Sequence, residues 1–178
     1  MRDISKEICE AGERTVREYI TISGQEDEAL IPETFLTSLM AKRLHTSLKM
    51  QARVEQKLAL MAKEIHPDIS KTQYEALRGQ KADVALYENS KLKAIIEVKV
   101  ARDGTDLNTL KRDLQKGKDV FSGSVPLYGA YFICETEISL DQQIERIEEV
   151  VGGRLACKTP PIQSATKEWS WCFACIKR

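Results

Sequence analysis

The sequence predicts an α/β protein, in which helices and strands follow one another along a single chain of 178 residues. Two runs rich in apolar and β-branched residues, 81–87 and 93–100, have the composition of strands and are separated by a short polar break. A near-continuous apolar run at 127–134 is typical of a buried central strand. Apolar residues recur at helical spacing in several other segments. The length and the apolar content of 42% suit one domain with a full core.

The first part of the chain is expected to form two helices. Residues 3–20 place apolar side chains at helical spacing among charged ones, and a polar connector follows. Pro32 suits the first position of the second helix, because its missing N–H is not needed there, and Glu33 lies in the first turn. Apolar residues between positions 35 and 44 give this helix its stripe.

Residues 50–66 fit two patterns. Apolar residues follow a helical spacing, but the first part of the segment also alternates apolar and polar residues as a strand does. Periodicity cannot separate these patterns over so short a span. We favour a strand near 51–56 followed by a helical turn or two. Residues 67–80 are expected to form a loop.

The two strand-like runs are expected to pair as an antiparallel hairpin. If the loop comprises the three residues from Asn89 to Lys91, facing residues have numbers that sum to 180. Asp83 then lies opposite Glu97. Directly opposed side chains are about 4.5–5.5 Å apart at Cβ, which lets two carboxylates share one cation.

Alternation along the strands then separates a polar face from an apolar one. Lys99 joins Asp83 and Glu97 on the polar face. A loop one residue shorter or longer would send the two carboxylates to opposite faces. The other face is expected to be wholly apolar and to comprise Ala82, Val84, Leu86, Ala94, Ile96 and Val98.

The second half of the chain is expected to add two helices and two strands. A helix over about 105–120 begins at good capping residues, and the apolar run described above follows it. Ser139 caps a further helix that extends through Val150, and Gly152-Gly153 stops it. Alternating residues from Trp169 to Cys175 predict a last, half-buried strand.

The polar face of the hairpin indicates metal chemistry. Two like charges side by side repel each other, and a Mg²⁺ or Mn²⁺ ion between Asp83 and Glu97 removes that conflict. Lys99 points the same way, where it can orient a water or stabilise negative charge on a phosphate. This combination suits metal-assisted phosphodiester hydrolysis. The simpler alternative is an ordinary amphipathic hairpin with a Glu/Lys solvent face.

The motif resembles that of the PD-(D/E)XK nuclease superfamily. In that family an Asp on the second strand precedes Glu/Asp-x-Lys on the third, and here Ala82-Asp83 and Glu97-Val98-Lys99 match those positions. The residue before Asp83 is Ala where the family often has Pro. The Gln-x-x-x-Tyr pair of the exonuclease-like branch is missing, because Asp119 stands four residues after Gln115.

The resemblance, which covers about residues 30–135, implies a fold. It implies a restriction-endonuclease-like αβββαβ core whose central mixed sheet is flanked by helices. An N-terminal helix and a C-terminal helix–strand extension would complete a single nuclease-like domain over residues 1–178.

The resemblance also implies site residues. Asp83, Glu97 and the main-chain carbonyl of Val98 would hold Mg²⁺ (or Mn²⁺), and Lys99 would position the nucleophile or the phosphate. Glu33 resembles the Glu that the first core helix supplies in many members, and it would bind a metal-bound water or a second ion. Glu55 is the fallback if that helix lies later in the chain.

Nucleic acid is the partner that the resemblance implies. The helix at 105–120 is similar to one that often faces nucleic acid, with Lys111, Gln115 and Lys118 as the expected contacts. Two basic clusters stand out in the sequence, each of which also reads as an ordinary solvated face: Lys42, Arg43, Lys49, Arg53 and Lys57, and Lys111, Arg112, Lys116 and Lys118.

Composition and charge limit the kind of binding surface and the cellular location that can be expected. The net charge is zero, so any nucleic-acid surface must be a local patch. No run approaches 18 apolar residues, and the charged N-terminus lacks the apolar core of a signal peptide, so no membrane span or secretion is expected. Five scattered cysteines suggest reduced thiols in the cytoplasm. Cys172 and Cys175 have zinc-knuckle spacing, but on a strand they would point to opposite faces.

The sequence therefore predicts a divalent-metal-dependent nuclease that hydrolyses phosphodiester bonds. DNA is the favoured substrate, in restriction, repair or mobile-element processing. Two alternatives stay open: a catalytically silent nucleic-acid-binding or structural protein of the same fold, and a nuclease subunit targeted by a partner protein. The modest size leaves little room for a separate recognition domain, so a homodimer or a larger complex is plausible.

Overall fold

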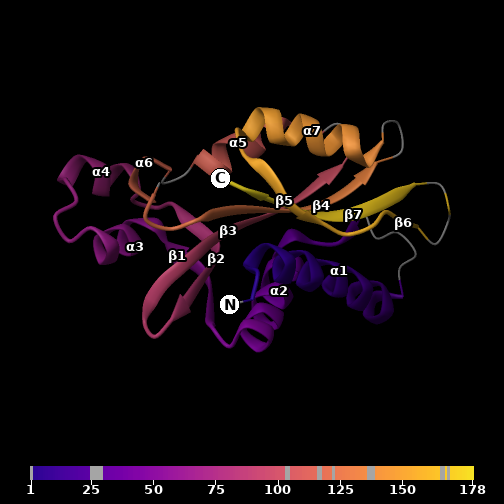
Figure 1. Cartoon of the computed structure of the whole chain (residues 1–178), viewed down its shortest axis with the longest axis horizontal. Coiled ribbons are helices and arrows are strands. Elements are labelled where there is room, and N and C mark those ends of the chain that lie inside the picture. Colours follow the sequence, from indigo (N-terminus) through magenta and orange to yellow (C-terminus); the bar gives the residue numbers. More distant parts are fainter. Residues whose placement is uncertain are drawn as a thin grey trace.

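The computed structural model describes residues 2–24, 30–102, 105–115, 118–121, 123–135, 139–164, 167 and 169–178. This part of the chain forms an α/β fold in which a seven-stranded mixed sheet has helices on both faces (Figure 1), as the sequence predicts. None of the helices within these ranges combines the length and the apolar character needed to cross a bilayer.

The described elements mix helices and strands along the chain. In order, they are α1 (Ile4–Ser23), α2 (Glu33–Leu48), β1 (Gln51–Lys57), α3 (Leu58–Ile65), α4 (Lys71–Ala76), β2 (Lys81–Glu88), β3 (Lys91–Arg102), α5 (Leu107–Gln115), α6 (Lys118–Phe121), β4 (Leu127–Glu135), α7 (Leu140–Val151), β5 (Arg154–Lys158), β6 (Ile162–Gln163) and β7 (Ser170–Lys177). The sheet order is β1-β2-β3-β4-β7-β5, and β6 pairs with β7. β3 and β4 run parallel, and the other pairs are antiparallel.

The core lies on both sides of this sheet. Helices α1 and α2 cover one face, and α5 and α7 cover the other at the β4–β7 end (Figure 1). The short helices α3, α4 and α6 gather at the end of the molecule near β1 and β2, where they enclose a smaller apolar cluster. Val84, Ile96 and Val98 pack toward α1 and α2, while Ala85 and Ile95 pack toward the smaller cluster. Alternation along β2 and β3 therefore gives the hairpin two buried faces.

Local signals predict several elements correctly. The ambiguous segment is a strand followed by a short helix, β1 and α3, which confirms the favoured pattern. Ser139 accepts from the backbone N–H of Gln142 and caps α7, and Gly152 in the left-handed conformation ends that helix.

Other expectations are corrected by the structure. The segment 67–80 is not all loop, because α4 forms within it behind a capping box of Ser70 and Gln73. The helix expected over 105–120 is divided into α5 and α6. Of its expected capping residues 103–106, residues 103–104 lie outside the described residues, and Asp106 Oδ1 accepts from the backbone N–H of Asn108 at 2.9 Å as a capping side chain does. Strand β7 is not half-buried. It lies between β4 and β5, and Trp171 and Cys172 pack into clusters on opposite faces of the sheet.

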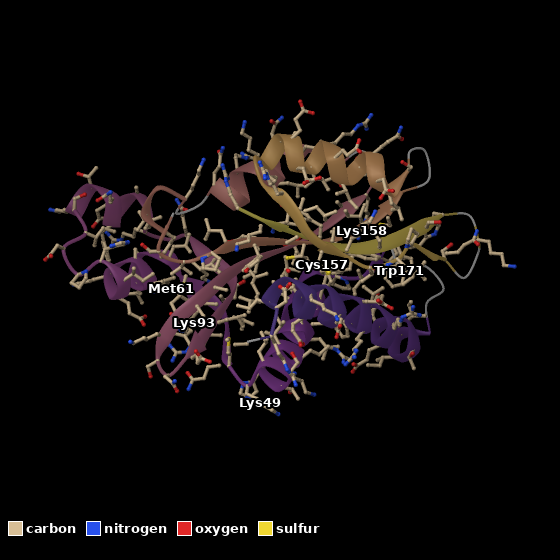
Figure 2. All side chains as sticks on the ribbon, viewed as in Figure 1. Lys49, Met61, Lys93, Cys157, Lys158 and Trp171 are labelled. Carbon is tan, nitrogen blue, oxygen red and sulfur yellow. The ribbon has the colours of Figure 1, made fainter. Side chains whose placement is uncertain are left out.

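The hairpin loop is shorter than expected, yet the expected register is present. Its two residues, Asn89 and Ser90, both have positive φ, which suits the tight turn of a twisted hairpin. Leu86 faces Ala94, but the next residue, Tyr87, faces Leu92, so Lys93 (Figure 2) is an extra residue in β3. This bulge compensates for the missing loop residue. The facing pairs from 84 to 86 therefore have numbers that sum to 180, as predicted.

A glycine brings α1 close to the sheet. A Cβ built on Gly12 would lie 2.4 Å from ring atoms of Phe173 on β7, a ring that is fully buried. We expect Gly12→Ala to lower the free energy of unfolding by about 1–2 kcal/mol, because overpacking costs more than the roughly 1 kcal/mol gained in helix propensity. Urea unfolding measures the change. Thr21→Ala on the exposed part of α1 is the control, and an unchanged Gly12→Ala midpoint would show that the ring gives way.

Candidate functional site

The predicted motif lies where β2 is irregular. Backbone pairing of β2 with β1 passes from Val54↔Val84 to Gln56↔Ala82 and leaves out Asp83, whose neighbour Glu55 has a positive φ. Ala82, one residue before Asp83, packs into the smaller apolar cluster near α3. It therefore does not lie on the apolar face predicted for it. The β1–β2 pairs on both sides of this point keep one register, so no residue is inserted here. The change of side at Ala82 coincides with the gap in the pairing at Asp83 and with the positive φ of Glu55.

Asp83 is fixed by a backbone hydrogen bond. The last pair between β2 and β3 toward Asp83 is Val84↔Ile96, and the backbone N–H of Val98 donates to Asp83 Oδ2 at 2.7 Å. The Asp83 carboxylate therefore accepts a hydrogen bond where the next backbone carbonyl of β2 would otherwise accept one from β3. This contact ties the Asp to the Glu-x-Lys strand and holds one of its oxygens at a defined place.

Lys99 joins two acids from distant parts of the chain. Its Nζ lies 2.7 Å from Glu33 Oε1 and 3.8 Å from Asp83 Oδ2. The Lys99 and Asp83 side chains are 15% and 18% exposed, and that of Glu33 is 43% exposed. Glu33 is the first residue of α2, where a helix N-terminus favours negative charge. The structure thus brings three of the four predicted catalytic side chains into direct contact.

Glu97, the fourth, lies two residues before Lys99 on β3 and is only 5% exposed. Alternation places it on the same side of the strand as Lys99. Burying a carboxylate is costly unless hydrogen bonds or a cation stabilise its charge. A buried acid beside a charged cluster is a common feature of functional sites.

Glu55, the fallback acid, lies elsewhere. It is on strand β1 and not on a helix, and its carboxylate pairs with Lys81 at 2.9 Å on the surface. The structure therefore places Glu33, and not Glu55, against Lys99. The sequence could not choose between them, because the Lys99–Glu33 contact spans 66 residues.

The expected nucleic-acid contacts are on the surface. Lys111 and Gln115 are exposed on α5, and Lys118 is exposed at the start of α6. Lys116 lies outside the described residues. In the other basic cluster, Arg43 pairs with Glu18 on α1, and the Arg53 guanidinium lies 4.2 Å from the centre of the Tyr87 ring. Arg43 and Arg53 of that cluster therefore already contact groups within the chain.

The donor set determines which cation suits the site. Among the described residues, no group of three or more His, Cys, Asp or Glu side chains is arranged to hold a metal. Mg²⁺ needs fewer protein ligands, because it is usually bound by one or two carboxylates while keeping several waters. Asp83, Glu97 and the Val98 carbonyl offer only hard oxygen donors, and so they fit Mg²⁺ or Mn²⁺.

The cysteines favour no second metal site. Cys172 and Cys175 pack into clusters on opposite faces of the sheet, as expected from their spacing. Burial raises the pKa of Cys172 to about 12, so its thiolate, the form that binds zinc, is disfavoured.

Sequence reasoning missed one feature beside the motif. Gly129 interrupts the apolar run of β4 and is the register partner of Glu97. An isolated glycine within a strand signals a close approach of other atoms, and this signal was available in the sequence.

Comparison with known proteins adds no assignment. No family model, curated protein or solved structure matches the chain. Its function therefore has to be inferred from the geometry around Lys99.

Proposed function

We propose that this protein is a divalent-metal-dependent nuclease that hydrolyses phosphodiester bonds, with DNA as the favoured substrate. The observation that carries the proposal is the placement of the Lys99 ammonium between the carboxylates of Asp83 and Glu33, next to the buried Glu97 on the same strand. An ordinary amphipathic hairpin would instead show a solvated Glu/Lys face.

The order of elements supports a restriction-endonuclease-like core. From α2 the chain passes through β1, β2 and β3 to α5 and then β4, which pairs in parallel with β3. This is an αβββαβ order with α3 and α4 inserted between the first two strands. The motif residues lie on the second and third strands of that order, and Glu33 begins its first helix.

Each residue would have a separate role. Asp83, Glu97 and the carbonyl of Val98 would hold Mg²⁺ or Mn²⁺, which when bound lowers the pKa of a water and stabilises charge on a phosphate. Lys99 would donate a hydrogen bond to a phosphate oxygen or to the attacking water. Glu33 would hold the Lys99 side chain in place through the 2.7 Å contact. Lys111, Gln115 and Lys118 would bind the nucleic-acid backbone.

A catalytically silent protein of the same fold is the second candidate. The ion pairs of Lys99 also support this second candidate, because its ammonium group already compensates the charges of Asp83 and Glu33 without a metal ion. A nuclease subunit targeted by a partner, or a homodimer, is a further candidate. All five cysteines are free, which suits the proposed cytoplasmic location.

A cleavage panel separates these candidates. End-labelled single-stranded DNA, duplex DNA and RNA are incubated with the purified protein in Mg²⁺, in Mn²⁺ and in EDTA. We expect DNA to be cleaved only in the presence of a metal ion, and Glu97→Gln to abolish the products. Binding of nucleic acid without cleavage under any condition would favour the silent protein. Cleavage that persists at the wild-type rate in a folded, purified Glu97→Gln variant would remove Glu97 from the mechanism.

A further inference from the structure

Three cysteines from distant parts of the chain share the apolar cluster between the sheet and α1. Cys9 lies on α1, Cys157 on β5 and Cys175 on β7. Cys9 and Cys175 are buried members of this cluster, and the partly buried Cys157 packs against it. Figure 2 shows the Cys157 sulfur on the side of the sheet that faces α1. The proposed nuclease mechanism uses none of these thiols.

Register and helix spacing explain why the thiols meet. Cys157 and Cys175 are directly paired on β5 and β7, so their side chains point to the same face of the sheet. Gly12 lets α1 approach Phe173, which lies two residues before Cys175 and on that same face. Cys9 is three residues before Gly12, on the same side of α1. The close approach of α1 at Gly12 therefore brings Cys9 to the paired cysteines.

The three thiols differ in access to solvent. Burial raises the pKa of Cys9, and a hydrogen bond with the Cys157 thiol raises it further. Burial also raises the pKa of Cys175. Both thiols therefore stay protonated at neutral pH, whereas Cys157 is the one of the three that is partly exposed. An oxidant from solvent reaches Cys157 first, because the oxidation of a cysteine follows its exposure.

We propose that Cys157 is a peroxide-sensitive thiol that forms a disulfide with Cys9. The Cys157 sulfur attacks the O–O bond of a hydroperoxide, which leaves a sulfenic acid on Cys157. The proton of the Cys157 thiol goes to the leaving oxygen and completes an alcohol or water. The Cys9 sulfur then attacks the sulfenic sulfur, so that the S–S bond forms and the S–OH bond breaks. The departing hydroxide takes the Cys9 proton and becomes water. Two electrons pass in total from the two thiols to the peroxide.

Cys9 is a better partner for Cys157 than the other two cysteines near it in the fold. Its thiol is already in hydrogen-bond contact with that of Cys157, and small side-chain rotations can bring two such thiols to disulfide geometry. Cys175 is directly opposite Cys157, but opposed strand residues are about 4.5–5.5 Å apart at Cβ, and a disulfide prefers about 3.8 Å. Cys172 packs into the cluster on the other face of the sheet.

The test follows the thiols of the folded protein during peroxide treatment. The reduced protein is treated with an equimolar amount of hydrogen peroxide, unfolded in N-ethylmaleimide and digested without reductant. We expect mass spectrometry to detect a linked pair of peptides that contain Cys9 and Cys157, with two of the five thiols lost. Dithiothreitol should restore both thiols. The same treatment in concentrated urea should give mixed linkages, because the fold no longer holds the two cysteines together.

Three variants assign the steps. Cys157→Ala should keep all its remaining thiols. Cys9→Ala should instead accumulate the sulfenic acid on Cys157, which dimedone traps. Cys172→Ala is the matched control, because Cys172 is also buried on β7 but lies on the opposite face from Cys175. The Cys9–Cys157 disulfide should form in this control as in the wild-type protein.

Four results would overturn the proposal. The first is a wild-type protein that keeps all its thiols, and the second is a linkage of Cys157 to Cys175 in place of Cys9. The third is an equal yield of the Cys9–Cys157 pair in folded and urea-unfolded protein, which would show that the fold does not direct it. The fourth is loss of this pair in Cys172→Ala.

Discussion

Replacing Lys99 by alanine is expected to abolish metal-dependent cleavage, a loss of at least about 10²–10³-fold. This is the usual cost of removing one donor aimed at charge that develops in the transition state. The fold should persist, because the Glu33 side chain that Lys99 contacts is 43% exposed to solvent and Asp83 keeps the hydrogen bond from the backbone N–H of Val98. Single-turnover cleavage with excess enzyme measures the chemical step directly.

Metal binding in Lys99→Ala distinguishes a catalytic lysine from a structural one. The substitution removes a positive charge 3.8 Å from Asp83, so Mn²⁺ affinity should stay the same or increase. A structural role would instead lower both affinity and stability.

Lys93→Ala is the matched control. Lys93 lies on the same strand and pairs with Glu88 at 3.4 Å on the surface, where such pairs contribute little. The Lys93→Ala variant should cleave at the wild-type rate. A folded Lys99→Ala variant that also cleaves at that rate would remove Lys99 from the mechanism.

The second large effect is expected at Asp83. Asp83→Asn should weaken Mn²⁺ binding about 100-fold or more, since even partners outside the ligand shell contribute 10–100-fold to metal affinity. The amide oxygen of Asn can still accept from the Val98 backbone N–H, which Asp83 Oδ2 now does at 2.7 Å. The hairpin should therefore keep its shape, and calorimetry should report the loss of charge alone.

Asp83→Ala separates the two roles of this carboxylate. It removes the acceptor as well as the charge, so it should also lower the free energy of unfolding by about 1–3 kcal/mol. Asp68→Asn, at an exposed position outside the strands, should change neither property. Unchanged Mn²⁺ affinity in Asp83→Asn would exclude Asp83 as a ligand.

The register of the hairpin shows how far sequence reasoning can reach. The pairs of residues 84–86 follow the expected register, but this register arises from a two-residue turn plus a bulge at Lys93 and not from a three-residue loop. Strong apolar alternation on both strands favours this register, because a one-residue slip would expose the core-facing side chains. Other combinations of turn length and bulge would give the same register.

The buried strand β7 and the short helix α4 show where such reasoning fails. The alternation from Trp169 to Cys175 predicts a strand with one exposed face. In the structure β4 and β5 pair with the two edges of β7, and side chains on its two faces pack into clusters beneath helices on either side of the sheet. The helix α4 was missed, although Ser70 and Gln73, which form its capping box, are a signal in the sequence for the start of a helix.

Within this protein the sequence by itself determined the features that depend on near neighbours. These are the caps of α7 and the alternation that places Glu97 and Lys99 on one side of β3. They follow from the periods of strands and helices, which a few residues are enough to define.

Only the tertiary structure decided the contacts that complete the site. Glu33 and not Glu55 meets Lys99, Asp83 accepts from the backbone N–H of Val98, and Gly129 on β4 is the register partner of Glu97. The first of these joins residues 66 positions apart, and the last depends on which strands become neighbours. No local period encodes such pairings, because they depend on how the helices and strands pack across the whole sheet.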